Sequence, residues 1–247
     1  MKIAVYGISK NEQEHADRWA ASASTADACL VCDTGSTDKT VEILTNKGIR
    51  VVSTIHSPFR FDDARNAALA MLPKDIDYCI SLDLDEVLPE DWREILEPVL
   101  QLSPTRVNHG FASHWQDGSI SEHFHERIHA RHGYRWVLPV HEKLVWYDSL
   151  KEEKIAWAED LVIHQYPNRG KDRSGYLPLL EQAIAEPFGK DDWKVAYFLA
   201  EEYLGASRYK ECRETVLRCL AHGNEVWPDF RKILLKMIEE CDRPEKA

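Results

Sequence analysis

CISLDLDEVLPEDW, residues 79–92, places three carboxylates directly after a short apolar run. The apolar residues predict a buried strand, and Pro89 favours the start of a helix. Asp83, Asp85 and Glu86 would repel one another at the end of such a strand unless positive charge lay between them. Carboxylate oxygens are the ligands that divalent cations such as Mg²⁺ prefer in proteins, so this stretch predicts a cation site.

Strand–helix pairs are predicted before this stretch. The expected strands are 2–6, 28–32, 50–55 and 76–82, and the expected helices are 12–23, a segment capped by Ser36 or Thr37 that ends at Asn46, and 62–72. Strands that alternate with helices of this length predict an α/β fold with a largely parallel sheet. Ligands of such sheets bind at the carboxyl ends of the strands, where segments 7–11, 33–38, 56–65 and 83–86 would meet.

The chain changes character after residue 105. Residues 105–164 are rich in aromatic side chains and histidine, and alternation at 126–130, 134–136 and 143–146 predicts short strands. From residue 171 the period is helical, with helices expected at 172–186, 192–206, 209–222 and 227–241. The second and third of these have the spacing of one tetratricopeptide unit. We therefore expect two domains, 1–168 and 169–247, with the boundary within YPNRGKDRSG, residues 166–175.

The composition limits the classes of function. The chain has 247 residues and a formal net charge of −11, which disfavours a general nucleic-acid binder. No apolar run is long enough to span a membrane, and MKIAVYGISKNEQ lacks the pattern of a signal peptide, so we expect a cytoplasmic protein of a bacterium or virus. The cysteines lie in apolar runs or on helical faces, as buried thiols of a reducing compartment do. Cys29 and Cys32 would point to opposite faces of one strand.

Two further motifs lie at the expected ligand edge. In LVCDTGSTDKT, Asp33 ends a strand and could accept an N–H group of a nucleobase, although a plain turn and helix cap is an equal alternative. In FRFDDARNAAL, Arg65 could hold a diphosphate or a base as a bidentate donor. The alternative for Arg65 is a surface ion pair with Asp62 or Asp63, which would stabilise the fold little.

The motifs together form an ordered set. It consists of ISKNEQ (8–13), DTGSTDKT (33–40), FDDARNAAL (61–69), LDLDE (82–86), VHEKL (140–144) and VIHQYP (162–167). This set resembles the family 2 glycosyltransferases of the GT-A fold, in the branch that carries a tetratricopeptide-like helical tail. The resemblance covers most of the chain. It implies a hexosyltransferase-type enzyme that uses Mn²⁺ or Mg²⁺ and moves a sugar from a nucleotide-sugar donor, foremost a UDP-sugar, to an acceptor hydroxyl with inversion.

The resemblance also implies roles for single residues. The donor-binding residues would be Ser9, Asn11, Asp33, Arg65 and Asp83, and the metal ligands would be Asp83, Asp85 and His164. Asp33 would contact the nucleobase and Asp83 the ribose or the metal, while Asp85 would be the main metal ligand and a catalytic residue. A buried structural role is the alternative for His164.

An inverting transfer needs a general base that deprotonates the acceptor hydroxyl. Glu142, next to His141 in the VHEKL segment, is the first candidate. Asp117 and Glu126 are the competing candidates. The family pattern places an acidic residue in this region without fixing its position, so the three alternatives stay open.

The histidines of the middle region allow two interpretations. His123, His125, His129 and His132 could bind zinc, but no cysteine or carboxylate completes a zinc site at the usual spacing. We expect instead that these histidines line a sugar-binding surface together with Trp115 and Trp136.

Other functions fit parts of the sequence. DLDEV matches the DxDx[TV] motif of aspartate-nucleophile phosphatases, but there the motif ends the first strand of the domain, and here it would end the fourth. A non-catalytic protein that binds a nucleotide, or a partner through its tail, is the second alternative. The acceptor could be a glycan, a protein or another hydroxyl compound, with a nucleic acid disfavoured by the negative charge. The helical tail could also mediate homo-oligomer formation.

Overall fold

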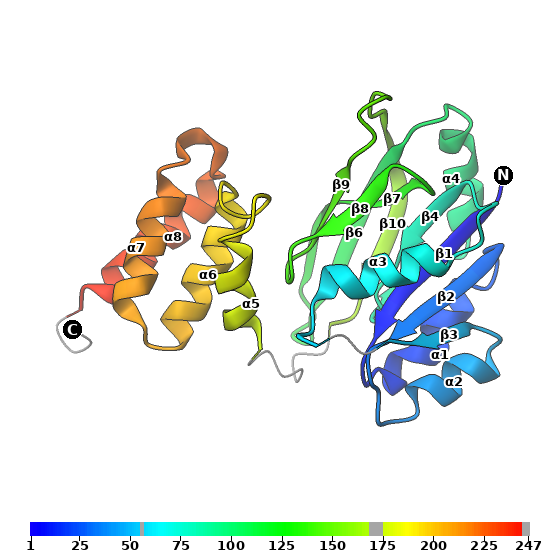
Figure 1. The fold of residues 1–247 in the computed structure, drawn as a ribbon, viewed down its shortest axis with the longest axis horizontal. Helices are drawn as coiled ribbons and strands as arrows, with labels where there is room; N and C mark the ends of the chain where they lie inside the picture. The colour runs from blue at the N-terminus through cyan, green and yellow to red at the C-terminus, as the bar shows by residue number, and fades with distance from the viewer. Residues whose placement is uncertain (55–56, 168–174, 244–247) are drawn as a thin grey trace. The chain divides into compact units, whose positions relative to one another are not determined.

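The computed structural model describes residues 1–54, 57–167 and 175–243 and divides into two compact units (Figure 1). The sheet unit comprises Met1–Phe59, Asp63–Trp136 and Leu144–Gly170, and the helical unit comprises Arg60–Asp62, Val137–Lys143 and Lys171–Ala247. Residues 55–56, at the end of a predicted strand, and 168–174, in the predicted domain boundary, lie outside the described residues. The division into domains 1–168 and 169–247 therefore stays a prediction.

One eight-stranded sheet forms the frame of the sheet unit. Its strands are β1 (Ile3–Ser9), β2 (Ala28–Asp33), β3 (Arg50–Ser53), β4 (Tyr78–Ser81), β5 (Glu86–Val87), β6 (Arg106–His114), β7 (Ile120–Ala130) and β10 (Ile155–Gln165), in the order β3-β2-β1-β4-β7-β6-β10-β5. The first four strands in this order are parallel, β7 is antiparallel to both of its neighbours, and β10 is again parallel to β6. The predicted α/β class with a mostly parallel sheet is confirmed.

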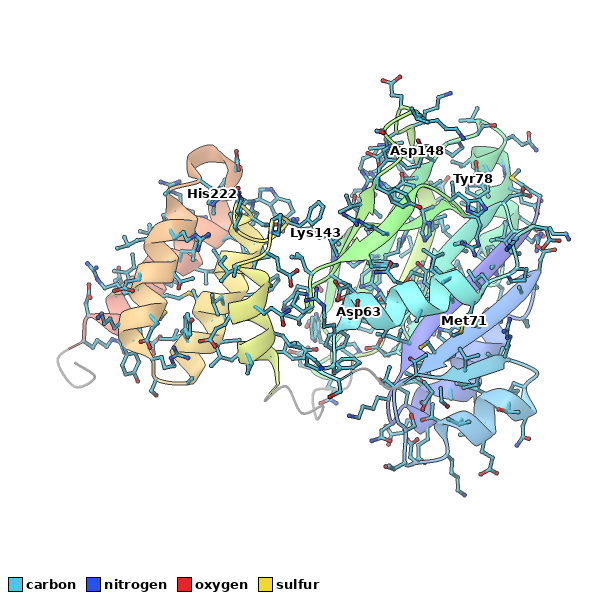
Figure 2. All side chains as sticks on the ribbon, in the orientation of Figure 1. Asp63, Met71, Tyr78, Lys143, Asp148 and His222 are labelled. Carbon is cyan, nitrogen blue, oxygen red and sulfur yellow. The ribbon has the colours of Figure 1, made fainter. Side chains whose placement is uncertain are left out.

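Helices cover both faces of the sheet because its central strands alternate between two hydrophobic cores. The helices are α1 (Gln13–Ser22), α2 (Thr40–Asn46), α3 (Phe61–Met71) and α4 (Trp92–Leu100), and Asp63 and Met71 near the two ends of α3 are labelled in Figure 2. In β1, Val5 faces a core that includes Trp19 of α1, whereas Tyr6 faces a core that includes Ala68 of α3. All four side chains are fully buried.

The same alternation separates Cys29 from Cys32 in β2. Cys29 packs against the core that contains Trp19, and Cys32 lies in the core that contains Ala68. All cysteines described are free thiols. The prediction that these two cysteines point to opposite faces is confirmed, so they form neither a disulfide nor a shared metal site.

The segment after the acidic stretch differs from the prediction. Glu86 and Val87 form the short strand β5, which pairs antiparallel with Gln165 and His164 of β10. This pairing holds the chain extended, so the next helix begins at Trp92 and not at Pro89. The predicted helix start was wrong because the sequence does not show that Glu86 and Val87 find a strand partner some 80 residues later.

The second half of the sheet is also more regular than predicted. Two strands, β6 and β10, were not expected, and β7 begins well before residue 126. Register shifts interrupt the pairing between Val107 and His109 and between Ala158 and Val162, which breaks the alternation that the sequence would otherwise show. The predicted strands at 134–136 and 143–146 correspond to β8 (Tyr134–Val137) and β9 (Lys143–Trp146), which form a separate two-stranded sheet.

The helical unit contains the helices predicted from the sequence. They are α5 (Tyr176–Ala183), α6 (Trp193–Gly205), α7 (Tyr209–Leu220) and α8 (Pro228–Cys241), with a short 3-10 helix at Gly223–Glu225. Residues of α6 and α7 that the pattern placed on their shared side, such as Leu199, Ala200 and Val216, are buried. The likeness of this pair to a tetratricopeptide unit stays a prediction. Within the described residues, no helix combines the length and the apolar character needed to cross a bilayer.

Candidate functional site

Asp33, the last residue of β2, organises the turn that follows it. Its Oδ1 accepts hydrogen bonds from the hydroxyl groups of Ser9 at 2.9 Å and Ser36 at 2.5 Å. Its Oδ2 accepts from the backbone N–H groups of Gly35 and Ser36, each at 3.0 Å. Burial alone would raise the pKa of Asp33, but these bonds outweigh it and lower the pKa below its usual value. Asp33 and Ser9, both predicted to bind the donor, are therefore brought together.

Asn11 ties this turn to the end of β1. Its side-chain oxygen accepts a hydrogen bond from the backbone N–H of Thr37 at 2.8 Å, and its own N–H donates to the Ser36 hydroxyl at 2.9 Å. The following helix begins at Thr40, whose N–H donates to Asp38 at 2.9 Å, so the predicted cap by Ser36 or Thr37 was wrong. Ser9, Asn11 and Asp33, the three predicted donor residues at or just after the ends of β1 and β2, thus form one fixed corner at the carboxyl edge of the sheet.

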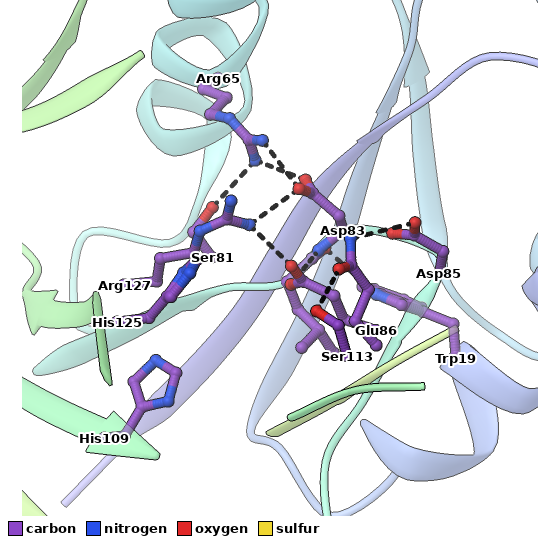
Figure 3. Close-up of polar contacts among 12 residues, drawn as sticks. Trp19, Arg65, Ser81, Asp83, Asp85, Glu86, His109, Ser113, His125 and Arg127 are labelled. Carbon is purple, nitrogen blue, oxygen red and sulfur yellow. Dashed lines mark hydrogen bonds and ion pairs between the residues drawn. The ribbon is translucent and has the colours of Figure 1, made fainter. Parts of the chain in front are cut away.

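Arg65 and Asp83 are joined directly at the same edge (Figure 3). Nη1 of Arg65 lies 2.7 Å from Oδ1 of Asp83, and Nη2 donates to Oδ2 at 3.0 Å. Nη1 also donates to the Ser81 hydroxyl at 3.2 Å. The Cζ atom of the guanidinium lies over the Trp136 ring, 5.1 Å from its centroid. The alternative of a surface ion pair with Asp62 or Asp63 does not describe Arg65, because its side chain is only 4% exposed.

Arg127 brings a second guanidinium to the carboxylates of the acidic stretch. Nη1 of Arg127, from β7, donates to Oδ2 of Asp83 at 2.8 Å and to Oε1 of Glu86 at 3.0 Å. The other oxygen of Glu86 accepts the backbone N–H of Asp83 at 2.8 Å. We call the side chains of Arg65, Asp83, Glu86 and Arg127 the charge cluster. The positive charge that the sequence predicted between the carboxylates is therefore supplied at least in part by arginine.

Burial and charge act in opposite directions within the charge cluster. Burial alone would raise the pKa of Asp83, but the two guanidinium groups outweigh it and lower the pKa well below its usual range. Burial raises the pKa of Glu86, because the opposing effect of Arg127 is smaller and Asp83 and Asp85 add repulsion. Asp83 is thus the carboxylate held firmly in its charged form, and it is the more exposed of the pair at 24% against 1%.

Asp85 faces a residue that the sequence did not single out. Its Oδ2 accepts a hydrogen bond from the side-chain amide of Gln165 at 3.3 Å, and Gln165 is oriented by a 3.0 Å bond from the Ser113 hydroxyl. Successive side chains of a strand point to opposite faces, and His164 instead lies with its Nδ1 2.9 Å from Nε2 of His114. A ligand role for His164 stays a prediction.

The aspartates of the acidic stretch carry the type of ligand atom that suits a hard cation. Asp83 and Asp85 offer carboxylate oxygens, which Mg²⁺ and Mn²⁺ prefer. Within residues 1–54, 57–167 and 175–243, however, no three His, Cys, Asp or Glu side chains are grouped as a metal site. Both oxygens of Asp83 already contact guanidinium groups, so Asp83 would have to exchange a guanidinium contact to hold a cation.

Glu142, the first candidate base, lies in the connection between β8 and β9, and this connection belongs to the helical unit. The ring of the adjacent His141 stacks on the ring of Phe198 in α6, with the ring centroids 3.7 Å apart and an interplanar angle of 4°. Lys143 on the other side forms an ion pair with Asp192, which caps α6. The helices therefore fix the backbone that carries Glu142, and His141 adopts a φ of +50° within it.

The competing base candidates have local partners. Asp117 accepts the N–H and the hydroxyl of Ser119 at 3.0 and 2.6 Å, which fixes the turn between β6 and β7. Glu126 forms a 2.9 Å ion pair with Arg106 of β6. Each contact gives its residue a structural role.

The predicted histidine surface is only partly formed. His129 is fully buried and bonded to the Tyr6 hydroxyl at 2.9 Å, and Trp136 is 4% exposed and donates to the same hydroxyl at 2.8 Å. These two residues cannot line a sugar-binding surface, and that part of the prediction was wrong. His123 and His125 lie with their Nε2 atoms 2.7 Å apart and form a pair. Of the charge cluster, Arg127 lies on the same strand as this pair, β7.

Comparison with known proteins begins with the sequence. The glycosyl transferase family 2 model matches residues 13–157, which is more than half of the chain and includes the Asp33 turn and the charge cluster. No protein with a curated description matches the chain in sequence.

Solved structures share the fold at low identity. The crystal structure of S. aureus TarS is 13% identical with a TM-score of 0.58 over 98% of this chain, which spans only 53% of that chain. Its 1–349 fragment in complex with UDP-GlcNAc is 12% identical, with a TM-score of 0.52 over 98% of this chain and 80% of that one. Glucosyl-3-phosphoglycerate synthase from Mycobacterium tuberculosis, in complex with Mg²⁺ and UDP, is 18% identical, with a TM-score of 0.51 over 74% and 77%. These likenesses support the GT-A fold.

Proposed function

The chain belongs to glycosyl transferase family 2, and on that premise we propose that it transfers a sugar from a nucleoside-diphosphate sugar, foremost a UDP-sugar, to an acceptor hydroxyl. The observation that carries the proposal is the meeting of the Asp33 turn and the charge cluster at the carboxyl edge of one sheet. Ligands of α/β sheets bind at this edge. TarS and the mycobacterial synthase, which share the fold, were crystallised with UDP-GlcNAc and UDP.

The donor would lie across this edge. The corner of Ser9, Asn11 and Asp33 would receive the nucleobase, because its backbone is fixed by the hydrogen bonds that Asp33 and Asn11 accept. Arg65 and Asp83 would face the ribose and the diphosphate, since a guanidinium and a carboxylate suit phosphate oxygens and ribose hydroxyls.

Asp85 would hold Mg²⁺ or Mn²⁺, with His164 as a further proposed ligand. Such an ion supplies Lewis-acid stabilisation of the leaving diphosphate. Gln165 would keep the Asp85 carboxylate in position through its 3.3 Å hydrogen bond. Asp83 contributes mainly by orienting Arg65 and Arg127, because both of its oxygens contact them.

Glu142 would deprotonate the acceptor hydroxyl, whose oxygen then attacks the anomeric carbon from the side opposite the leaving group and inverts it. A glycan or protein hydroxyl is the acceptor class we propose, because the net charge of −11 opposes approach to nucleic acid.

We also propose a cytoplasmic location for the protein and self-association through its helices. A phosphatase loses its support, because the acidic stretch ends the fourth strand of a family 2 domain.

Calorimetric titration with UDP, with and without Mn²⁺, tests the donor site. We expect wild type to bind UDP more tightly with Mn²⁺, and Asp85→Ala to lose this gain. Asp91→Ala is the matched control, because Asp91 lies in the same stretch but is exposed and caps no helix N–H with its side chain. Absence of UDP binding in folded wild type, with and without Mn²⁺, would contradict the proposed function.

A further inference from the structure

Two cysteines of the helical unit are in contact. Cys212 lies near the start of α7 and Cys241 is the last residue of α8, and the two thiols share a side-chain hydrogen bond. The residues that follow them in the chain, Arg213 and Asp242, form an ion pair with 3.2 Å between Nε and Oδ1. Two separate contacts therefore hold the end of α8 against α7 at the position of these thiols.

The two thiols differ in how a small molecule can reach them. Cys212 is fully buried, whereas Cys241 is 7% exposed and lines a cavity of about 610 Å³. Burial, and after it the hydrogen bond with Cys241, raises the pKa of Cys212 to about 12, so this thiol stays protonated at neutral pH. Cys241 is thus the thiol that a molecule in the cavity meets first.

The rest of the cavity lining comes from the start of α7 and the turn before it. Its charged residues are three cations and one carboxylate, namely Arg208, Lys210, Arg213 and Glu211. Cations close to a cysteine favour its thiolate, which is the nucleophilic form. Partial access and nearby cations are the two features that distinguish reactive cysteines from inert ones.

We propose that Cys212 and Cys241 form a site of reversible thiol–disulfide exchange, whose substrate is a small organic disulfide that enters the cavity beside Cys241. The two cysteines are the reduced form of this site. The product is an internal disulfide that joins α7 to α8. Nothing in this chemistry depends on nucleotide or sugar, so the site goes beyond the proposed function.

The exchange takes place in two balanced steps. The thiolate of Cys241 attacks one sulfur of the organic disulfide, so that a mixed disulfide forms as the original S–S bond breaks and one thiolate leaves. The sulfur of Cys212 loses its proton and attacks the sulfur of Cys241, which releases the second thiolate. The two leaving thiolates take up the two protons that the cysteines lost. Two protein thiols are thereby oxidised while one organic disulfide is reduced to two thiols.

The product would tie the final helix of the described chain to its neighbour. A cross-link restricts the unfolded chain more than the folded one, provided that the folded structure accepts it without distortion. Because the two side chains already touch, we expect the oxidised protein to unfold at a higher temperature than the reduced protein. A lower unfolding temperature after oxidation would contradict the site, since it would show that α7 and α8 must distort to form the bond.

Oxidised glutathione is the probe for the wild-type protein. The folded, fully reduced chain is incubated with it at about pH 8, where cysteine thiols begin to ionise, and is then examined by intact mass and peptide mapping. We expect a chain that has lost two hydrogen atoms, with the peptides of Cys212 and Cys241 joined, and recovery of both thiols with dithiothreitol. Folded wild type that keeps all its thiols, or that first joins another pair such as Cys29 and Cys32, would overturn the proposal.

Single variants test the order of the two steps. Cys212→Ala should stop at the mixed disulfide and carry one glutathione on Cys241. Cys241→Ala should react with oxidised glutathione at least about tenfold more slowly than wild type, because the remaining Cys212 is fully buried. Cys219→Ala is the matched control, since Cys219 is also buried in α7 but donates to the Trp193 carbonyl oxygen at 3.2 Å. It should form the internal disulfide as wild type does.

Each result with a folded variant bears on the proposal. Folded Cys212→Ala without a glutathione adduct, or Cys241→Ala that reacts at the wild-type rate, would contradict the role of Cys241 as the attacking thiol. Thermal unfolding establishes that each variant is folded. Peptide mapping of the wild-type protein decides the matter on its own if a variant does not fold.

Discussion

The side chain of Asn66 pairs with the backbone of Trp136 in both directions. Its Nδ2 donates to the Trp136 carbonyl oxygen at 2.9 Å, and its Oδ1 accepts the Trp136 N–H at 2.9 Å. The Trp136 ring in turn lies beside the guanidinium of Arg65, which holds Asp83. One asparagine of α3 therefore fixes the surface against which the charge cluster is built.

Asn66→Asp should damage this arrangement more than its small change in shape suggests. Aspartate has no N–H to donate, and it brings a carboxylate oxygen against the Trp136 carbonyl, which leaves a partly buried polar group unsatisfied. We expect a loss of about 1–3 kcal/mol in the free energy of unfolding, measured in urea. Asn46→Asp, at the exposed end of α2, is the control, and equal stability of the two variants would contradict the inferred pairing.

Gly7→Ala tests the close contact between β1 and the end of β4. A Cβ at Gly7 would lie 2.3 Å from the carbonyl oxygen of Leu82, a backbone atom that cannot turn aside. We expect destabilisation by about 1–3 kcal/mol and weaker UDP binding, because Leu82 precedes Asp83. Gly205→Ala should leave stability unchanged or higher, since nothing lies within 4 Å of its added Cβ. An unfolding midpoint unchanged by Gly7→Ala would refute the contact.

The hydrogen bonds of Asp33 predict a pH dependence. Its pKa is lowered in the folded state below the usual 3.8, so its stabilising effect is fully present above the unfolded pKa and is lost as the pH falls through the folded pKa. Asp33→Asn should cost about 1–2 kcal/mol at pH 7, and the difference from wild type should shrink below about pH 4. Urea unfolding at several pH values measures this, with exposed Asp17→Asn as the control. A difference that stays constant with pH would show that the charge of Asp33 is not what the turn stabilises.

Phe198→Ala tests whether the helices position the segment that carries Glu142. Loss of the stacking on His141 should loosen that segment and lower the turnover number of sugar transfer about tenfold to a hundredfold. The dissociation constant for UDP should not change, because the donor residues belong to the sheet unit. Leu217→Ala, at an exposed position of α7, serves as control. Parallel loss of UDP binding and turnover would point to general unfolding.

The first half of the fold could be predicted because its signals are local. Each of the strands β1 to β4 is a short apolar segment followed by turn residues, and the segments between them have helical periodicity. The second half depends on contacts between distant residues. β5 exists only because Glu86 meets Gln165, and β6 and β10 contain register shifts that the local pattern does not reveal.

The candidate site divides in the same way. Asp33, Arg65, Asp83 and Asp85 stand in recognisable motifs, and the structure brings Asp33 to Ser9 and Arg65 to Asp83. Arg127 and Gln165 carry no such signal, because each reaches the site only through its strand register. Alternation along β10 could have suggested that His164 and Gln165 face opposite sides, but not which one faces Asp85.

Release of UDP from a panel of UDP-sugars in the presence of Mn²⁺ tests the central claim most directly. We predict that wild type releases UDP from at least one of these donors, faster when an acceptor is supplied, and that Asp85→Ala does not while exposed Asp91→Ala does. Release by Asp85→Ala at the wild-type rate, or no release by folded wild type from any nucleotide sugar, would contradict the assignment of this chain as a nucleotide-sugar glycosyltransferase.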